Sequence, residues 1–275
     1  MGRLNKLEFL MGRPFHRLHL RDPGLCWYLH GIPGLGADLP QTLAALRRLI
    51  APLEAGKLLM LGQSMGGYGA ILYGHALGAD KAVAFGPLSH MDPEESRRNG
   101  DTRWLPVMER LAADGLAAAD TDLLALLAER PSRMTLRLHY GMRPDDPAHG
   151  ATNLDLLHAD RFASLPGCRI TRHPDSDHVV VEHLKRRREL DAVLLEELFD
   201  IDCALLHRRQ RPLLDDRMLQ WMAENMLRGA DRQKLLTHLQ ETGFAALTAR
   251  SAMAEVERDP VYLAAAKLLE QRNGS

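Results

Sequence analysis

The serine in the segment GQSMG, residues 62–66, has the neighbours that a catalytic nucleophile needs. An apolar run at 57–62 ends there, and a stretch of small and apolar residues with helical period follows at 65–77. So sharp a turn from strand to helix strains its central residue and holds the hydroxyl at the helix N-terminus, where amides favour an oxyanion. We therefore predict Ser64 as the nucleophile and the Met65 amide as one oxyanion donor. The alternative is a tight turn in which Ser64 only caps the helix.

A serine hydroxyl needs a base to take its proton, and in this arrangement an acid and then a histidine follow the serine along the chain. His178 lies in a short polar loop between a strand candidate at 168–174 and the next helix, from which a side chain can reach over the sheet edge. We predict His178 as the base. His173 falls at the end of the strand and His183 on the helix, so both are expected to be structural or surface residues.

The acid that orients the histidine has two candidates of equal weight on position alone. Asp146 follows directly after the strand candidate at 134–141, and Asp155 opens a helix that precedes His178. A solvated turn explains the first carboxylate and a helix dipole the second, without any catalytic role. Asp92, after an earlier strand, is a weaker third candidate.

The second oxyanion donor is expected in the loop LHGIPGLG, residues 29–36, with Ile32 as the donor. Its glycines and proline let backbone amides face the serine. A phosphate-binding loop is disfavoured because no Gly-Lys-Ser/Thr follows and the dinucleotide spacing is absent.

Up to about residue 200 the chain alternates short apolar runs with stretches of helical period, which predicts an α/β fold: a mainly parallel sheet with helices on both faces. Beyond that point the period is helical throughout, with no strand candidate. An initial hairpin is expected from 7–11 and 15–21. Helices are expected at 39–53 and 65–77, and buried strands at 25–31, 57–62, 81–86, 134–141 and 168–174.

Three regions are predicted from this alternation: a main domain at 1–200, a helical cap inserted at 91–132, and a helical extension at 201–275. Within or beside the cap, His90, Met91 and Trp104 are candidates for lining the substrate site. The spacing of Trp104, Leu105, Met108 and Leu111 also fits one helix face packed in the core.

The composition favours neither nucleic acid nor a membrane as partner. Lys and Arg number 35 against 36 Asp and Glu, and the basic run at 185–188 lacks interleaved aromatic residues. No run reaches membrane-spanning length and no secretory segment develops. Three widely separated cysteines fit neither a disulfide framework nor a metal site, so we expect a cytoplasmic protein.

Together the motifs HGIPGLG, GQSMGG and DSDHVV, in this order, give residues 25–198 a resemblance to the α/β-hydrolases. The resemblance implies acyl transfer to Ser64, an oxyanion held by the amides of Ile32 and Met65, attack by water with help from His178, and no cofactor or metal. The segments HYG and LDLLHADRFASLPG resemble a bacterial branch in which the acid precedes a His-Ala pair, which favours Asp155. Asp146 stays a candidate because the intervening MRPDDPAHGATN departs from the simpler pattern.

The expected substrate is a small acyl ester, with a thioester or a sugar acyl ester as variants. The sugar ester is implied by the part of that branch associated with polysaccharide or glycoconjugate biosynthesis. Two alternatives remain: an acyltransferase using the same site, and a non-catalytic scaffold that binds a partner, or a second copy, through its C-terminal helices.

Overall fold

The computed structural model describes residues 15–129, 133–144, 153–187, 189–201, 216–242, 244 and 246–273. The chain divides into two compact units, Met1–Ile201 and Asp202–Ser275. The boundary lies one residue from the one expected from the sequence.

The first unit is an α/β unit built on a four-stranded parallel sheet. Its strands are β1 (Leu59–Gln63), β2 (Lys81–Phe85), β3 (Thr135–Gly141) and β4 (Cys168–His173), hydrogen-bonded in the order β1-β2-β3-β4. Leu59 pairs with Lys81, Lys81 with Thr135, and Leu136 with Cys168. Because all four strands run the same way, their carboxyl ends share one edge, and the segments that follow them meet there.

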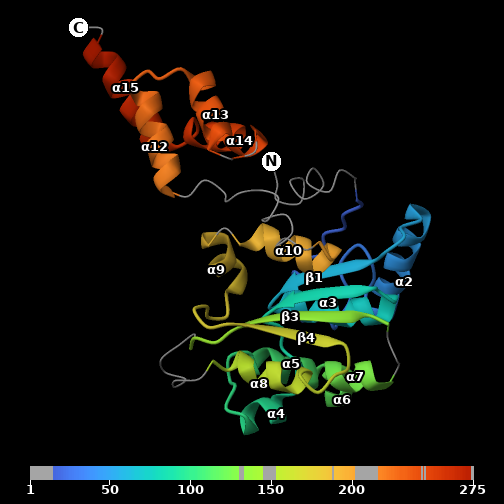
Figure 1. Cartoon of the computed structure of the whole chain (residues 1–275). Helices are drawn as coiled ribbons and strands as arrows, with labels where there is room; N and C mark the ends of the chain where they lie inside the picture. The colour runs from blue at the N-terminus through green and yellow to red at the C-terminus, as the bar shows by residue number, and fades with distance from the viewer. Residues whose placement is uncertain are drawn as a thin grey trace. The chain divides into compact units, whose positions relative to one another are not determined.

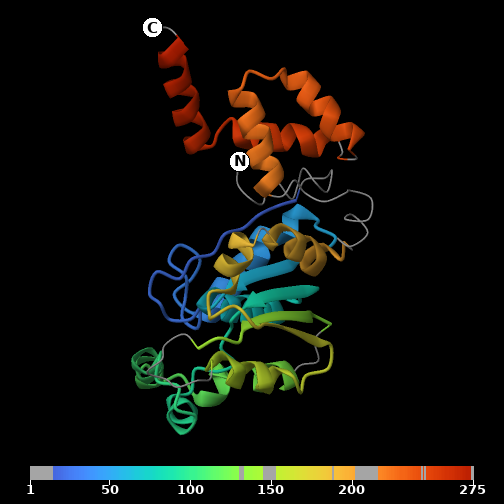
Figure 2. The same ribbon diagram turned by 60° about the vertical axis from the view of Figure 1, so that its left-hand side comes forward.

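Helices cover both faces of this sheet. The alternation of side chains along β3 shows this, since Leu136 and Leu138 belong to the main apolar core while Arg137 and His139 face Glu197. The helices outside the insertion are α2 (Leu39–Ile50), continued by the short helix Ala51–Leu53, α3 (Met65–Leu77), α8 (Asp155–Phe162), α9 (Val180–Arg186) and α10 (Leu190–Phe199). Helix α10 packs against β2 and α9 against β3; Figure 2 shows both helices in gold. The Asp38 carboxylate starts α2 by accepting the Gln41 amide at 2.8 Å.

The expected helical insertion lies between β2 and β3. It contains α4 (Pro93–Arg98), α5 (Leu105–Ala113), α6 (Ala118–Thr121) and α7 (Leu123–Glu129), grouped beside α8 in both views (Figure 1). The Tyr68 hydroxyl donates to the Thr121 carbonyl at 2.8 Å, which ties the insertion to α3. Met108 and Leu111 are buried, so this face of α5 packs in the core.

The expected first strand at 25–31 is wrong, because this segment is a compact loop. Leu25, Trp27 and Tyr28 have φ of 50°, 56° and 61°, which no strand residue adopts. The Asp22 carboxylate accepts the amides of Gly24, Cys26 and Tyr28 at 3.1, 2.7 and 3.0 Å and so replaces the bonds of a sheet ladder.

One isolated antiparallel bridge, His30 to Asp38, lies beyond that loop. Residues 15–21 form no strand either, and the first half of the expected hairpin, 7–11, lies outside the described residues.

The second unit is helical. It contains α12 (Asp216–Leu227), α13 (Arg232–Glu241), α14 (Ala246–Val256) and α15 (Pro260–Asn273). It has a core of its own, made of Met222, Met226, Leu235, Leu236, Leu239, Ala249, Ala252, Met253 and Val256. Every helix in the described part of the chain is too short or too polar to cross a lipid bilayer.

Candidate active site

Ser64 stands at the turn between β1 and α3 with φ 51° and ψ −122°, a conformation that a side chain rarely adopts. Its amide donates to the Phe85 carbonyl at 2.7 Å, and its carbonyl accepts the Tyr68 amide at 3.0 Å. A Cβ on Gly62 would lie 1.9 Å from the Gly66 carbonyl oxygen, so only glycine fits at the first position of the motif. A Cβ on Gly66 would meet open space, so close packing does not require the second glycine.

The Ser64 side chain faces a histidine instead of the helix that follows it. It makes no capping hydrogen bond to α3, which argues against the alternative of a simple helix cap. Its Oγ lies 2.9 Å from Nε2 of His178, 114 residues further along the chain.

His178 comes from the loop between β4 and α9, and other bonds hold this loop at the carboxyl edge of the sheet. The Met142 and Arg143 amides, just after β3, donate to the carbonyls of His173 and Ser176 at 3.1 and 2.8 Å. The Val180 amide donates to the His178 carbonyl at 3.0 Å.

Asp155, at the start of α8, is the carboxylate beside this histidine. Its Oδ2 lies 2.6 Å from Nδ1 of His178, and its side chain is 1% exposed. Asn153 accepts the Asp155 amide at 2.8 Å and so fixes the first turn of the helix. Asp146 lies outside the described residues, and Asp92 instead caps α4 by accepting the Glu94 amide at 2.9 Å.

Arg103, which the sequence did not single out, holds the other oxygen of this carboxylate. Its Nη1 lies 2.7 Å from Oδ1 of Asp155. Burial alone would raise the pKa of Asp155, but the hydrogen bonds and charges of His178 and Arg103 bring it below its usual value. The carboxylate is therefore ionised at neutral pH. An arginine one residue before a tryptophan carries no signal for this role.

These contacts fix the proton positions. An ionised Asp155 only accepts, so Nδ1 of His178 carries the proton and Nε2 accepts from the Ser64 hydroxyl. This tautomer is the one a general base requires.

The two predicted oxyanion donors differ in whether their backbone amide already has a hydrogen-bond partner. Met65 is the first residue of α3, where amides have no partner within the helix. The Ile32 amide, however, donates to the buried Thr42 Oγ1 at 3.0 Å. Because this bond already uses its only N–H, the expectation for Ile32 is wrong.

Two of the three candidates for substrate contact are buried. Met91 belongs to the core, and the ring of His90 accepts the Asp92 amide at 3.2 Å while burial lowers its pKa to about 4. Neither side chain is exposed to a ligand, so both expectations are wrong. Trp104 is 37% exposed, and its ring packs edge-on against Trp27 with centroids 5.5 Å apart.

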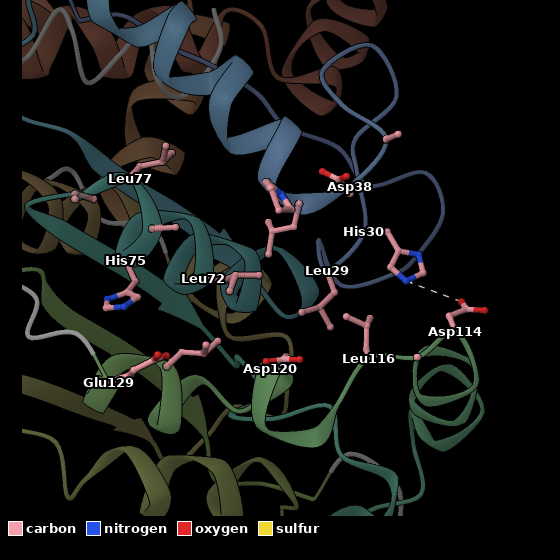
Figure 3. Close-up of a pocket in the computed structure, with 18 of the residues that line it drawn as sticks. Leu29, His30, Asp38, Leu72, His75, Leu77, Asp114, Leu116, Asp120 and Glu129 are labelled. Atoms are coloured by element: carbon pink, nitrogen blue, oxygen red, sulfur yellow. Dashed lines mark ion pairs between the residues drawn. The ribbon is translucent and has the colours of Figure 1, made fainter.

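A cavity of about 1010 Å³ lies elsewhere in the unit, at the C-terminal end of α3 (Figure 3). Leucines such as Leu29 and Leu72 line it, and His30 and Asp114 lie side by side at one end of it, with Nε2 and Oδ2 3.9 Å apart. Ser64 is at the opposite end of α3, which at 1.5 Å per residue is about 20 Å long. The cavity is therefore not the space in front of the serine.

No family model matches the chain, and no curated protein matches it. Among solved structures, it is similar to a chain of the "Glycosylation Associate Protein (Gap123) complex from Streptococcus agalactiae", with 17% identity and a TM-score of 0.40. The similarity covers 63% of this chain and 35% of that one, so this chain spans about a third of that protein's length. We infer neither fold family nor function from it.

Proposed function

We propose that this protein is a serine hydrolase of the α/β-hydrolase type, which cleaves a carboxylic ester through an acyl-enzyme on Ser64. The observation that carries the proposal is the unbroken line of hydrogen bonds from Ser64 Oγ to His178 Nε2, at 2.9 Å, and from His178 Nδ1 to Asp155 Oδ2, at 2.6 Å. Parts of the chain that are far apart in sequence supply these three side chains, and packing of a core does not require them to form such a line.

In the proposed reaction, His178 takes the hydroxyl proton as Ser64 attacks the acyl carbon. The negative charge that develops on the carbonyl oxygen is stabilised by the Met65 amide and the N-terminal dipole of α3. His178 then gives its proton to the leaving alcohol. Water, deprotonated by the same imidazole, attacks the acyl carbon. The bond from that carbon to Ser64 Oγ then breaks, the imidazolium returns its proton to Oγ, and the acid is released; Asp155 stabilises the imidazolium in both halves.

A fluorophosphonate probe tests the nucleophile directly. Wild-type protein is expected to be labelled covalently, and Ser64→Ala to be unlabelled, because the activated hydroxyl is the attacking group. Ser164→Ala is the matched control, since Ser164 is exposed and donates only to the Arg161 carbonyl. Absence of labelling in wild type between pH 6 and 9 would exclude the hydrolase and favour a non-catalytic scaffold.

Two aspartate variants of the same helix, α8, test the assignment of the acid. Asp155→Asn is expected to lower the rate of labelling by up to about 10⁴-fold, the loss that follows removal of the orienting carboxylate in other triads. Asp160→Asn is the control, because Asp160 is an exposed residue of α8 paired with Arg172. If Asp146→Asn, and not Asp155→Asn, abolished labelling, the assignment of the acid would be wrong.

A further inference from the structure

A buried network of charges joins the helical insertion to the catalytic acid. Arg103 bridges two carboxylates: Nη1 binds Asp155 Oδ1 at 2.7 Å, while Nη2 and Nε bind the two oxygens of Asp101 at 2.7 and 2.9 Å. The three side chains are 14%, 1% and 3% exposed. A planar guanidinium bound at three of its donors has little rotational freedom, so it fixes the carboxylates on either side of it.

The same network is anchored to α8 one turn beyond the acid. Nδ1 of His158 accepts the Ser89 amide at 3.0 Å, so a neutral His158 carries its proton on Nε2, which lies 3.4 Å from Asp101 Oδ2. Arg103 and His158 thus hold the Asp101 carboxylate from two sides, and the fixed carboxylate holds the Arg103 guanidinium in place. Burial opposes ionisation of Asp101, but hydrogen bonds from Arg103 and His158 bring its pKa well below the usual value.

Each oxygen of the Asp155 carboxylate therefore has one partner, His178 on one side and Arg103 on the other. A carboxylate held only by the histidine could rotate about its Cβ–Cγ bond. Held at both oxygens, it presents Oδ2 to the imidazole in one orientation. The guanidinium also neutralises part of the charge that the imidazole experiences.

We propose that Arg103 is a positioning residue of this site, which fixes the Asp155 carboxylate for His178 and makes the basicity of the catalytic histidine depend on the insertion. The inference rests on the proposed function of Ser64. Arg103 acts through Asp155 and touches no reacting atom. The insertion thus contributes to the triad, in addition to packing against it.

Replacing Arg103 by methionine is expected to change the pH dependence of labelling as well as its rate. Without Arg103, the full negative charge of Asp155 stabilises the His178 imidazolium. The low-pH limb of the profile of labelling rate against pH, called the acid limb here, therefore moves to higher pH by roughly 0.5 to 1 unit. Loss of orientation lowers the plateau by about 10²-fold. Among the described residues, the groups facing this pair are Ser64 between β1 and α3, Tyr140 of β3, and Arg103 with Asp101 of the insertion.

Two further variants separate charge from orientation. Arg103→Lys keeps the charge without the planar fork, so its acid limb stays at the wild-type position while its plateau falls less than that of Arg103→Met. In Asp101→Asn with Arg103→Met, the charges are removed as a pair, which protects the fold. This double variant is expected to move the limb in the same direction as Arg103→Met but by less, because the opposing charge of Asp101 is removed with that of Arg103.

Arg161→Met is the matched control. Arg161 lies on α8, pairs with Asp122 of the insertion and donates to Ser89 Oγ at 2.8 Å, so it also joins these two parts, but it touches neither Asp155 nor Asp101. It is expected to lose stability and keep the wild-type pH profile. If Arg103→Met and the double variant both label at the wild-type rate with the wild-type profile, Arg103 only stabilises the fold and the inference is wrong.

A second measurement does not need reactivity. The proton in the 2.6 Å bond between His178 and Asp155 should give a far-downfield resonance in proton NMR spectra. It should persist in Arg103→Lys and Arg161→Met and shift or disappear in Arg103→Met. If wild type is never labelled, the proposed function fails and the resonance alone decides: a shift in Arg103→Met supports the positioning role, and an unchanged resonance overturns it.

Discussion

Ser64 occupies a backbone conformation that costs on the order of 1 to 3 kcal/mol and persists only where its neighbours enforce it. Three constraints do so: its amide is bound to β2, its carbonyl accepts an amide of α3, and Gly62 allows the helix to approach. The strain holds the hydroxyl toward His178 and away from the helix end. At the scale of single residues, the site depends on backbone positions as much as on the side chains that would react.

Gly86 is a second such position, at the end of β2. Its φ is +57°, and a Cβ there would lie 3.1 Å from both Cε1 and Nδ1 of His178 and 3.4 Å from Asp155 Oδ2. Gly86→Ala is therefore expected to displace the imidazole and lower the rate of probe labelling by about 10²-fold. The measurement is the second-order labelling rate of protein that circular dichroism shows to be folded.

The variant Gly115→Ala separates the effect of backbone strain from the effect of displacing the imidazole. Gly115 also has a positive φ, +91°, but a Cβ there meets nothing within 4 Å. This variant is expected to lose stability and keep the wild-type labelling rate. Equal labelling rates in the two alanine variants would mean that Gly86 does not set the position of the histidine.

At the scale of elements, local sequence signals predicted the helices and strands whose formation depends on residues within the same segment. The helix expected at 65–77 is α3, residue for residue, and four of the five expected strands are present, because apolar runs and helix signals act within each segment. The loop after Asp22 was mistaken for a strand because its conformation comes from one carboxylate binding three amides. Apolar patterning does not encode that.

The residues of the site also divide into those that local sequence identifies and those whose role depends on contacts between distant segments. His178 follows from its place in a loop after the last strand. Asp155 could not be separated from Asp146 by position alone, since both follow β3. Arg103 gave no signal, because its role arises only when the insertion folds against α8.

Helix α10 is held on the sheet by a buried carboxylate, and this is testable. Glu197 lies 3.6 Å from both Arg137 Nε and His139 Nε2, and it also binds Arg169. Glu197→Gln is expected to destabilise the sheet unit by about 1 to 3 kcal/mol, because it leaves cations without their partner; Arg169 is largely solvated, which favours the lower end. Denaturant unfolding gives the value.

Glu196→Gln is the control on the same helix, since Glu196 is exposed. It is expected to be neutral within about 0.5 kcal/mol. Both variants should keep the labelling rate per folded molecule. A slower rate in Glu197→Gln would mean that α10 contributes to the site.

For the whole molecule, two separate cores require that unfolding of each unit be measured separately. Trp27 and Trp104 report on the sheet unit and Trp221 on the helical unit, whose core it packs against. A Trp221→Phe background therefore isolates the sheet unit in fluorescence. In this background the free energy of unfolding of the sheet unit can be measured as a function of pH.

The sheet unit should lose stability as the pH falls below about 6.5. Burial, and then neighbouring cations and histidines, lower the pKa of His90 to about 4 and that of His139 to about 3, so both stay neutral when folded. The unfolded chain binds these protons first, so the free energy of unfolding falls between pH 6.5 and 4, by on the order of 3 kcal/mol for each group. The lowered pKa of Asp155 adds a loss only at more acidic pH, below its ordinary value of 3.8.

Replacing His139 by phenylalanine tests this origin. The ring of His139 stacks on Phe85 with centroids 4.7 Å apart and also faces His173, Arg169 and Glu197. Phenylalanine keeps the stacking and cannot take up a proton, so the slope of unfolding free energy against pH should fall in this window. The fall should be less than half, because burial also lowers the pKa of His173 and that residue contributes to the slope as well. His19→Gln, at an exposed histidine, should leave the slope unchanged. An unaltered slope in His139→Phe would place the acid sensitivity elsewhere, because the two buried histidines would then not account for the protons bound on unfolding.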